Sequence, residues 1–289
     1  MGAMNNLKTV ALLSLMSALV WMLGWALFGG SQGLYIGLGF ALLLNVGAYF
    51  FSAKLALAMS KARPVTEQEL PKVYGMVRHL AAVSNMPVPS VHLIDSAQPN
   101  AFATGRNPKN AAVAVTTGIL EIMKDDEIEG VIAHELSHVR NRDILISSIA
   151  AMLAAALSIF ARMAFWFGGG NRRNNNAIGL VVALAAMILA PLAGMVIRMA
   201  ISRAREYQAD ASGAEMTGQP LSLARALEKI GTASGRIPMD VNPAVSQLFI
   251  ADPFKAFGRR RPAGAGGLFS THPPIEERIR RLENMYYRI

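Results

Sequence analysis

Residues 134–138 have the sequence HELSH, in which two histidines stand four positions apart and a glutamate follows the first. Residues four positions apart lie on one face of an α-helix, so the imidazoles of His134 and His138 can bind one metal ion. Glu135 can then act as the general base that activates a water molecule at the metal. These side chains predict metal-dependent hydrolysis, and zinc is the metal that His and Glu ligands suit best.

The flanking residues favour a helix at this position. An acidic first turn at Asp126 and Glu127 leads into an apolar stripe of Ile128, Val131 and Ile132. Acidic residues stabilise the N-terminal end of a helix, and the stripe has helical periodicity. The alternative is a solvated His/Glu pair on an amphipathic helix without a metal.

A catalytic zinc needs three protein ligands and one open position. The metzincin extension would place a glycine at 141 and a histidine at 144, where this chain has Asn141 and Ile144, so that class is excluded. The chain has no cysteine, which excludes disulfides and thiolate ligands. The third ligand must therefore be a His, Asp or Glu elsewhere in the chain.

The best candidate for the third ligand is Glu206. It stands four residues before Asp210, so a helix would present both carboxylates on one face. The first would bind the metal, and the second could accept the free ring N–H of a ligating histidine and fix its tautomer. Glu215 and Asp143 are weaker candidates for the ligand.

Four long apolar segments predict membrane spans, at residues 10–28, 34–53, 144–167 and 177–201. The first two contain no charged residue, and hydrophobic residues make up 53% of the chain. Each segment is about the length that crosses a bilayer. The first is too long for a secretory signal peptide and is followed at once by another span. Four membrane-spanning helices are therefore expected.

The last two segments each carry one arginine, Arg162 and Arg198. Both lie near segment ends, where a long side chain can reach the membrane interface. If they were instead functional charges, the protein could be a membrane scaffold or transporter in which HELSH is incidental. In that case, replacing either arginine would abolish transport.

Basic residues beside the spans predict the orientation in the membrane. The flanking residues Lys8, Lys54, Arg140 and Arg203 all fall on one side of the membrane, which the positive-inside rule assigns to the cytoplasm. We expect a hairpin at 1–59, a cytoplasmic part at 60–143, a second hairpin at 144–201 and a cytoplasmic part at 202–289. Both termini would be cytoplasmic. The net charge of +9 comes with no nucleic-acid recognition motif, so no nucleic-acid partner is expected.

Several motifs together resemble one family. HELSH is followed by NRD at 141–143 and later by SRAREYQAD at 202–210, with NAF at 100–102 and STHPPIEERI at 270–279. This set resembles the HtpX family of bacterial membrane zinc metalloproteases, which are gluzincins related to the CAAX prenyl-protein endopeptidases. The resemblance runs from the first span to the C-terminus.

The resemblance implies a role for each matching residue. One Zn²⁺ per chain would be bound by His134, His138 and Glu206, with Glu135 as general base and Asp210 behind the histidines. His272 and Arg278 occupy positions that would stabilise the oxyanion in related enzymes.

The resemblance also implies location and substrates. The chain would lie in the bacterial cytoplasmic (inner) membrane and cleave misfolded or damaged membrane proteins, or unfolded polypeptides, in a stress response. Cleavage would take place on the cytoplasmic side, near the bilayer. A processing peptidase with one defined substrate, such as a prenylated tail, is the alternative within the same class. The oligomeric state is not implied.

Three short runs predict a small β-sheet before the active-site helix. Residues 91–94, 101–104 and 111–117 are β-branched or alternating and are bounded by Pro, Asn and Gly. An amphipathic helix is expected within 60–85, and little regular structure within 231–270. The fold class is thus a mainly α, multi-pass membrane protein with four spans and a cytoplasmic, gluzincin-like protease domain that contains a small β-sheet.

A free edge of this sheet could bind an extended substrate by backbone pairing. The segment expected at this edge, and hence the candidate substrate-binding residues, is Asn100, Ala101 and Phe102. The alternative for Phe102 is that its ring only fills the core.

Overall fold

The computed structural model describes residues 30–149, 151–152, 203–260 and 273–287, together with single helical residues between 7 and 25. Of the predicted third and fourth spans, only 144–149 and 151–152 fall within these ranges, and they are helical. The rest of both spans, with Arg162 and Arg198, lies outside the described residues. His272 lies outside them as well.

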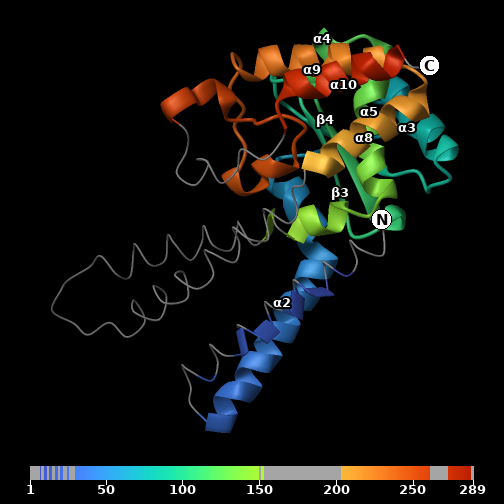
Figure 1. Cartoon of the computed structure of the whole chain (residues 1–289). Helices are drawn as coiled ribbons and strands as arrows, with labels where there is room; N and C mark the ends of the chain where they lie inside the picture. The colour runs from blue at the N-terminus through green and yellow to red at the C-terminus, as the bar shows by residue number, and fades with distance from the viewer. Residues whose placement is uncertain are drawn as a thin grey trace.

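Helix α2, Gly30–Met59, is the one helix among the described residues that is long and apolar enough to cross a membrane. At about 1.5 Å per residue its 30 residues measure roughly 45 Å. Most of its large apolar side chains are exposed, and it extends away from the rest of the protein (Figure 1). The predicted span at 34–53 lies wholly within α2. The four-span arrangement as a whole stays a prediction.

Residues of the first predicted span lie against α2. The side-chain amide of Asn45 donates to Ser17 Oγ at 2.6 Å and to the carbonyl oxygen of Leu13 at 3.4 Å. Farther along, a Cβ on Gly37 would lie 3.0 Å from the Cα of Trp21, so a glycine is needed for this close approach. These contacts support the predicted hairpin at 1–59.

The β-sheet has four strands in the order β1-β2-β4-β3. The strands are β1 (Arg63–Pro64), β2 (Ser90–Ile94), β3 (Ala101–Gly105) and β4 (Ala111–Thr116). β4 pairs in parallel with β2 and antiparallel with β3, where Ala103 lies opposite Val113. The three predicted strands are confirmed to within one residue at each end, and β3 is an edge strand as expected. β1 was not predicted, because two residues that include a proline give no alternating pattern.

Helix α5, Asp125–Arg140, is the centre of the domain that contains the sheet. It packs against β3 and β4 on one side and against α3 (Pro71–Val83), α8 (Arg203–Thr217) and α9 (Pro220–Ser234) around it. The backbone N–H of Lys124 donates to the Glu127 carboxylate at 2.8 Å, which caps the start of α5. The predicted amphipathic helix within 60–85 is α3.

The core between α5 and the sheet consists of fully buried aliphatic side chains. Each such Leu, Ile or Val contributes about 1.5–3 kcal/mol by leaving water. Members of this core are Val77, Leu80, Val113, Val115, Ile119, Val131, Ile132 and Leu136. The catalytic motif therefore lies on a helix that is held rigidly from one side by hydrophobic packing.

The segment after α9 has more structure than predicted. It contains two 3₁₀ helices, η2 (Pro243–Leu248) and η3 (Lys255–Arg260), before the chain continues to α10 (Ile275–Tyr286), which packs beside α9 (Figure 1). The expectation of little regular structure was therefore wrong for η2 and η3. Pro243 opens η2, because the fixed φ of proline suits a helix start.

Residues 250 and 251 are joined to the edge of the sheet next to β3. The N–H of Ile250 donates to the carbonyl oxygen of Ala101 at 3.0 Å. The Asn100 side chain donates to the carbonyl oxygen of Ala251 at 3.0 Å and accepts from its N–H at 3.3 Å. This pairing fixes the segment that follows η2 beside the catalytic helix.

Candidate active site

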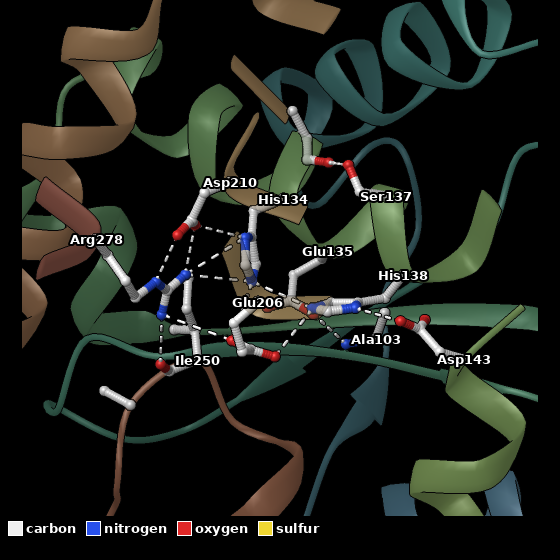
Figure 2. Close-up of polar contacts among 12 residues, drawn as sticks. Ala103, His134, Glu135, Ser137, His138, Asp143, Glu206, Asp210, Ile250 and Arg278 are labelled. Atoms are coloured by element: carbon white, nitrogen blue, oxygen red, sulfur yellow. Dashed lines mark hydrogen bonds and ion pairs between the residues drawn. The ribbon is translucent and has the colours of Figure 1, made fainter. Parts of the chain in front are cut away.

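Helices α5 and α8 bring the predicted site residues together. His134 and Glu135 are buried on α5, His138 is partly buried one turn later, and Glu206 and Asp210 are buried on α8 (Figure 2). The two helices approach closely, because a Cβ on Gly213 of α8 would lie only 2.9 Å from the backbone nitrogen of His134. Residues more than 60 positions apart in sequence thus meet at one point.

The geometry of three side chains fits a zinc ion. The Nε2 atoms of His134 and His138 are 3.3 Å apart, and the Glu206 carboxylate oxygens lie 3.8 Å and 3.6 Å from them. Tetrahedral zinc with bonds of about 2.0–2.1 Å separates its ligand atoms by about 3.3–3.4 Å. The three ligand atoms all lie within 4.8 Å of one another. The donor set of two imidazoles and one carboxylate suits catalytic zinc.

Asp210 lies behind His134, where the sequence predicted a carboxylate. Its Oδ1 is 3.0 Å from His134 Nδ1, so the ring donates its Nδ1 proton to Asp210 and leaves Nε2 free for a metal. Burial alone would raise the pKa of Asp210, but the Arg278 guanidinium outweighs this effect and lowers the pKa to about 2. Asp210 is therefore ionised and orients His134.

Asp143 does the same for His138. Its Oδ2 lies 3.0 Å from His138 Nδ1 (Figure 2). The backbone of Arg142 has a φ of 57°, a left-handed conformation that turns the chain sharply after α5 and brings Asp143 back to the histidine. In the sequence, Asp143 is a weaker candidate for the third ligand and nothing more. The spacing of five residues gave no signal for this contact, because it spans the helix end.

The surrounding carboxylates make His138 a strongly basic group without a metal. Burial alone would lower the pKa of His138, but the charges of Asp143, Glu206 and Glu135 raise it to about 10. A ligating histidine must be neutral, so metal binding displaces this proton. The same negative charges that hold the proton also attract a divalent cation.

Glu135 is positioned by the edge strand. The backbone N–H of Ala103 in β3 donates to Glu135 Oε2 at 2.8 Å. Burial raises the pKa of Glu135, the nearby carboxylate of Glu206 raises it further, and the histidines and the Ala103 N–H oppose this shift. A carboxylate with a raised pKa that lies beside the ligand set is suited to accept and return a proton.

Arg278 of α10 is fully buried and forms an ion pair with Asp210. Its Nε and Nη2 donate to the two oxygens of Asp210 at 2.8 Å and 2.7 Å, a bidentate ion pair. Its Nη1 donates to the carbonyl oxygen of Ile250 at 3.4 Å and lies 3.8 Å from Glu206 Oε2. The charges of these carboxylates raise the pKa of Arg278 despite burial. Its predicted oxyanion role stays a prediction.

A cleft opens beside the ligand set. The side chains around it come from β3, α5, the turn after α5, α8 and η2 with the residues that follow it, and include Ala103, Glu135, His138, Arg205, Gln247 and Ile250. Arg205 is the arginine of this lining and is half-buried. Burial lowers its pKa, but a guanidinium stays charged in proteins. The cleft therefore brings together a cation, a buried carboxylate and three side chains that could hold a metal ion.

The predicted substrate-binding residues lie at the edge strand, but their side chains face inward. Phe102 is fully buried and packs edge-on against Phe249, with ring centroids 5.0 Å apart. Asn100 is also buried and binds the backbone of Ala251. Of the rival ligands, Glu215 is exposed on α8. Any contact of residues 100–102 with substrate would therefore use main-chain atoms.

Comparison with known proteins identifies the family. The sequence profile of Peptidase family M48 matches residues 67–286. The chain belongs to this family. It is 50% identical over 287 residues to a "Protease HtpX homolog" of Syntrophobacter fumaroxidans, and the match covers 97% of this chain and 99% of that protein. A "Protease HtpX homolog" of Persephonella marina is 48% identical, with 99% of each chain covered.

The fold is also similar to that of a solved protein structure. The crystal structure of S. mikatae Ste24p matches with a TM-score of 0.50 at 18% identity, and covers 97% of this chain and 66% of that chain. At this identity the match shows the fold alone. Membership of family M48 makes this chain a membrane-associated metalloprotease, and the transporter or scaffold alternative is discarded.

Proposed function

We propose that this M48 peptidase is a zinc endopeptidase of the bacterial cytoplasmic membrane that cleaves misfolded or damaged membrane proteins and unfolded polypeptides on the cytoplasmic side. The observation that carries this proposal is the cluster of His134, His138 and Glu206 beside the buried Glu135, in a cleft next to an edge strand. Such an enzyme would serve protein quality control and a stress response.

The attachment of α2 supports cleavage close to the bilayer. The Arg106 guanidinium, in the loop after β3, lies 4.8 Å from the ring centroid of Phe50. Phe50 is within the last turn of the predicted span at 34–53. A cation–π contact therefore joins the loop after β3 to the end of the predicted span, which supports a protease domain close to the bilayer. Asp143 directly precedes the third predicted span, and Glu206 follows the fourth by five positions in the sequence.

The roles of the side chains follow from their positions. When bound, the zinc supplies a Lewis acid that polarises the scissile carbonyl and lowers the pKa of water. Glu135, held by the Ala103 N–H, takes a proton from the attacking water and returns it to the leaving amine. Asp210 and Asp143 keep the Nδ1 proton on His134 and His138, so that both rings present Nε2 to the metal. Arg278 keeps Asp210 ionised.

The edge strand favours loose sequence specificity. On β3 the backbone groups of Phe102 pair with β4, so those of Ala101 and Ala103 point away from the sheet. The carbonyl oxygen of Ala101 already accepts from Ile250, and the Ala103 N–H already donates to Glu135. An extended substrate would therefore pair from the carbonyl oxygen of Ala103 onward. Backbone pairing takes any sequence that is extended, which suits an enzyme for unfolded polypeptides.

The decisive experiment compares Glu135→Ala with wild type in detergent. Zinc content is measured by metal analysis and proteolysis by casein degradation. We expect Glu135→Ala to keep one zinc per chain and to lose proteolysis, because only the proton acceptor is removed. Glu129→Ala, the same change earlier on α5, is the matched control and should keep both. Casein cleavage by a folded Glu135→Ala protein would refute the proposed mechanism.

A further inference from the structure

Gln247 has an unusual environment for a buried amide. Its side chain lines the active-site cleft and the residue is only 5% exposed. Neither its Nε2 nor its Oε1 has a hydrogen-bond partner among the residues that the structure describes. A buried polar group without a partner destabilises the folded state, so native proteins rarely keep one without a function.

Neighbouring amides show that partners are available in this region. The Gln98 side chain donates to the carbonyl oxygens of Ile237 at 2.6 Å and Pro253 at 3.1 Å. The Asn100 side chain binds both backbone groups of Ala251. These two amides fix the segment that carries Gln247. Gln247 lines the cleft, and its buried amide atoms have no partner among the described residues.

The backbone holds Gln247 in place. The Asn242 side chain accepts from the N–H of Ala244 and caps η2, and Ser246 Oγ donates to the carbonyl oxygen of Pro243 at 2.8 Å. On either side of Gln247, Val245 and Phe249 are fully buried. The backbone that carries Gln247 is therefore fixed by its neighbours, which favours preorganisation for a ligand.

We propose that Gln247 is a substrate-binding residue that pairs with the main chain of the polypeptide in the cleft. Its Nε2 donates to a carbonyl oxygen of the substrate and its Oε1 accepts from a substrate N–H. A carboxamide has the same donor and acceptor as a peptide unit, so it binds extended chains without regard to their side chains. This inference rests on the proposed function, and deepens it.

Ala103 of β3 lines the same cleft, and because its N–H is held by Glu135, its carbonyl oxygen is the main-chain group that would pair with substrate. Gln247 adds a second contact to the substrate backbone from a different element of the fold. Two such contacts fix both the position and the direction of an extended polypeptide relative to Glu135. The recognised chemistry is thus the peptide backbone itself, in an unfolded or extended segment.

The test is Gln247→Met, which keeps an unbranched side chain of similar length without hydrogen-bonding groups. Full-length zinc-loaded enzyme in detergent is assayed on a fluorogenic peptide. We expect KM to rise about tenfold, which corresponds to about 1.4 kcal/mol, with kcat within about twofold of wild type. The Tm should stay the same or rise, because an unpaired buried amide is removed. Gln68→Met, at an exposed position, should change neither KM nor Tm.

A second measurement replaces single peptide bonds of the substrate by esters, one position at a time. In wild type, an ester at one position should raise KM, because it removes the substrate N–H that donates a hydrogen bond to Gln247 Oε1. In Gln247→Met the same ester should have no further effect, since the two changes remove one interaction. This non-additivity is a signature that a structural role would not produce.

Three results would overturn the inference. An unchanged KM in Gln247→Met would do so while leaving the proposed function intact. A lower Tm with unchanged KM would assign Gln247 a structural role. If wild type with bound zinc cleaves no polypeptide at all, the proposed function fails, and the inference fails with it.

Discussion

Asp143 Oδ2 lies 3.0 Å from His138 Nδ1, so a residue three positions beyond the end of the HELSH helix orients the second of its histidines. The first histidine is oriented by Asp210 from a different helix, also at 3.0 Å. The two predicted ligands of α5 thus each have a carboxylate partner, one local and one distant in sequence. Partners of this kind raise the basicity of a ligating imidazole and fix its tautomer.

Replacing Asp143 should therefore weaken metal binding without removing a ligand. We expect Asp143→Ala to lower zinc affinity about 10–100-fold, because His138 loses the group that fixes its ring. Competition with a chelator of known affinity measures this change. Asp95→Ala, in an exposed loop before β3, is the control and should bind zinc as wild type does. Equal zinc affinity in Asp143→Ala would show that the contact does not support the site.

Glu206 is the proposed third ligand, and Glu215 on the same helix provides a matched control. Glu206→Ala should lower zinc occupancy below one per chain, because two imidazoles alone bind zinc poorly compared with three ligands. Glu215→Ala should keep full occupancy, because Glu215 is exposed away from the cluster. Metal analysis after dialysis distinguishes the two. Full zinc in Glu206→Ala would place the third ligand elsewhere.

Much of the site could be predicted from the sequence because its spacing is local. His134 and His138 lie on one face of α5, and Glu206 and Asp210 on one face of α8, by the same four-residue rule. The meeting of the two helices was inferred from the chemistry of zinc, which needs a third ligand. The structure confirms that these helices lie together.

Other parts of the site could not be predicted, for physical reasons. The contact of Asp143 with His138 depends on the left-handed backbone conformation of Arg142, which no sequence pattern predicts. The burial of Arg278 depends on α10 packing over α8 and α9, far along the chain. The Gln247 side-chain amide, which has no hydrogen-bond partner among the described residues, lies in a 3₁₀ helix where little regular structure was expected. Such features arise from tertiary packing, which local sequence patterns do not predict.

Gly213 controls the approach of α8 to α5. A Cβ at this position would lie 2.9 Å from the backbone nitrogen of His134, so the helices must separate to accept a methyl group. We expect Gly213→Ala to destabilise the protein by about 1–3 kcal/mol through overpacking, and to lower zinc affinity by moving Glu206 away from the histidines.

The control for this prediction is Gly75→Ala. Gly75 lies within α3 with nothing inside 4 Å of its added Cβ, so alanine should stabilise that helix by about 0.5–1 kcal/mol. Thermal unfolding and zinc titration of both variants measure the two effects. A Gly213→Ala protein with wild-type Tm and zinc affinity would show that the two helices can shift at no cost.

Acid should weaken the ion pair of Asp210 and Arg278 in a predictable pH range. The pKa of Asp210 is about 2 in the folded protein, below the value of about 3.9 for an unperturbed carboxyl. A carboxyl with a lowered folded pKa stabilises the protein fully above its unfolded pKa. This stabilisation is lost as the pH falls through the folded pKa.

Asp210→Asn should therefore cost about 3–5 kcal/mol near neutral pH, since it leaves the Arg278 guanidinium buried without its counter-charge. The difference in unfolding free energy from wild type should stay constant above about pH 5 and shrink by about 1 kcal/mol by about pH 3, because only wild type loses the ion pair. Denaturant unfolding of chelator-treated protein at several pH values measures it. Asp125→Asn, which breaks the exposed pair with Lys72, should cost less than about 1 kcal/mol. A pH-independent difference for Asp210→Asn would contradict the lowered pKa.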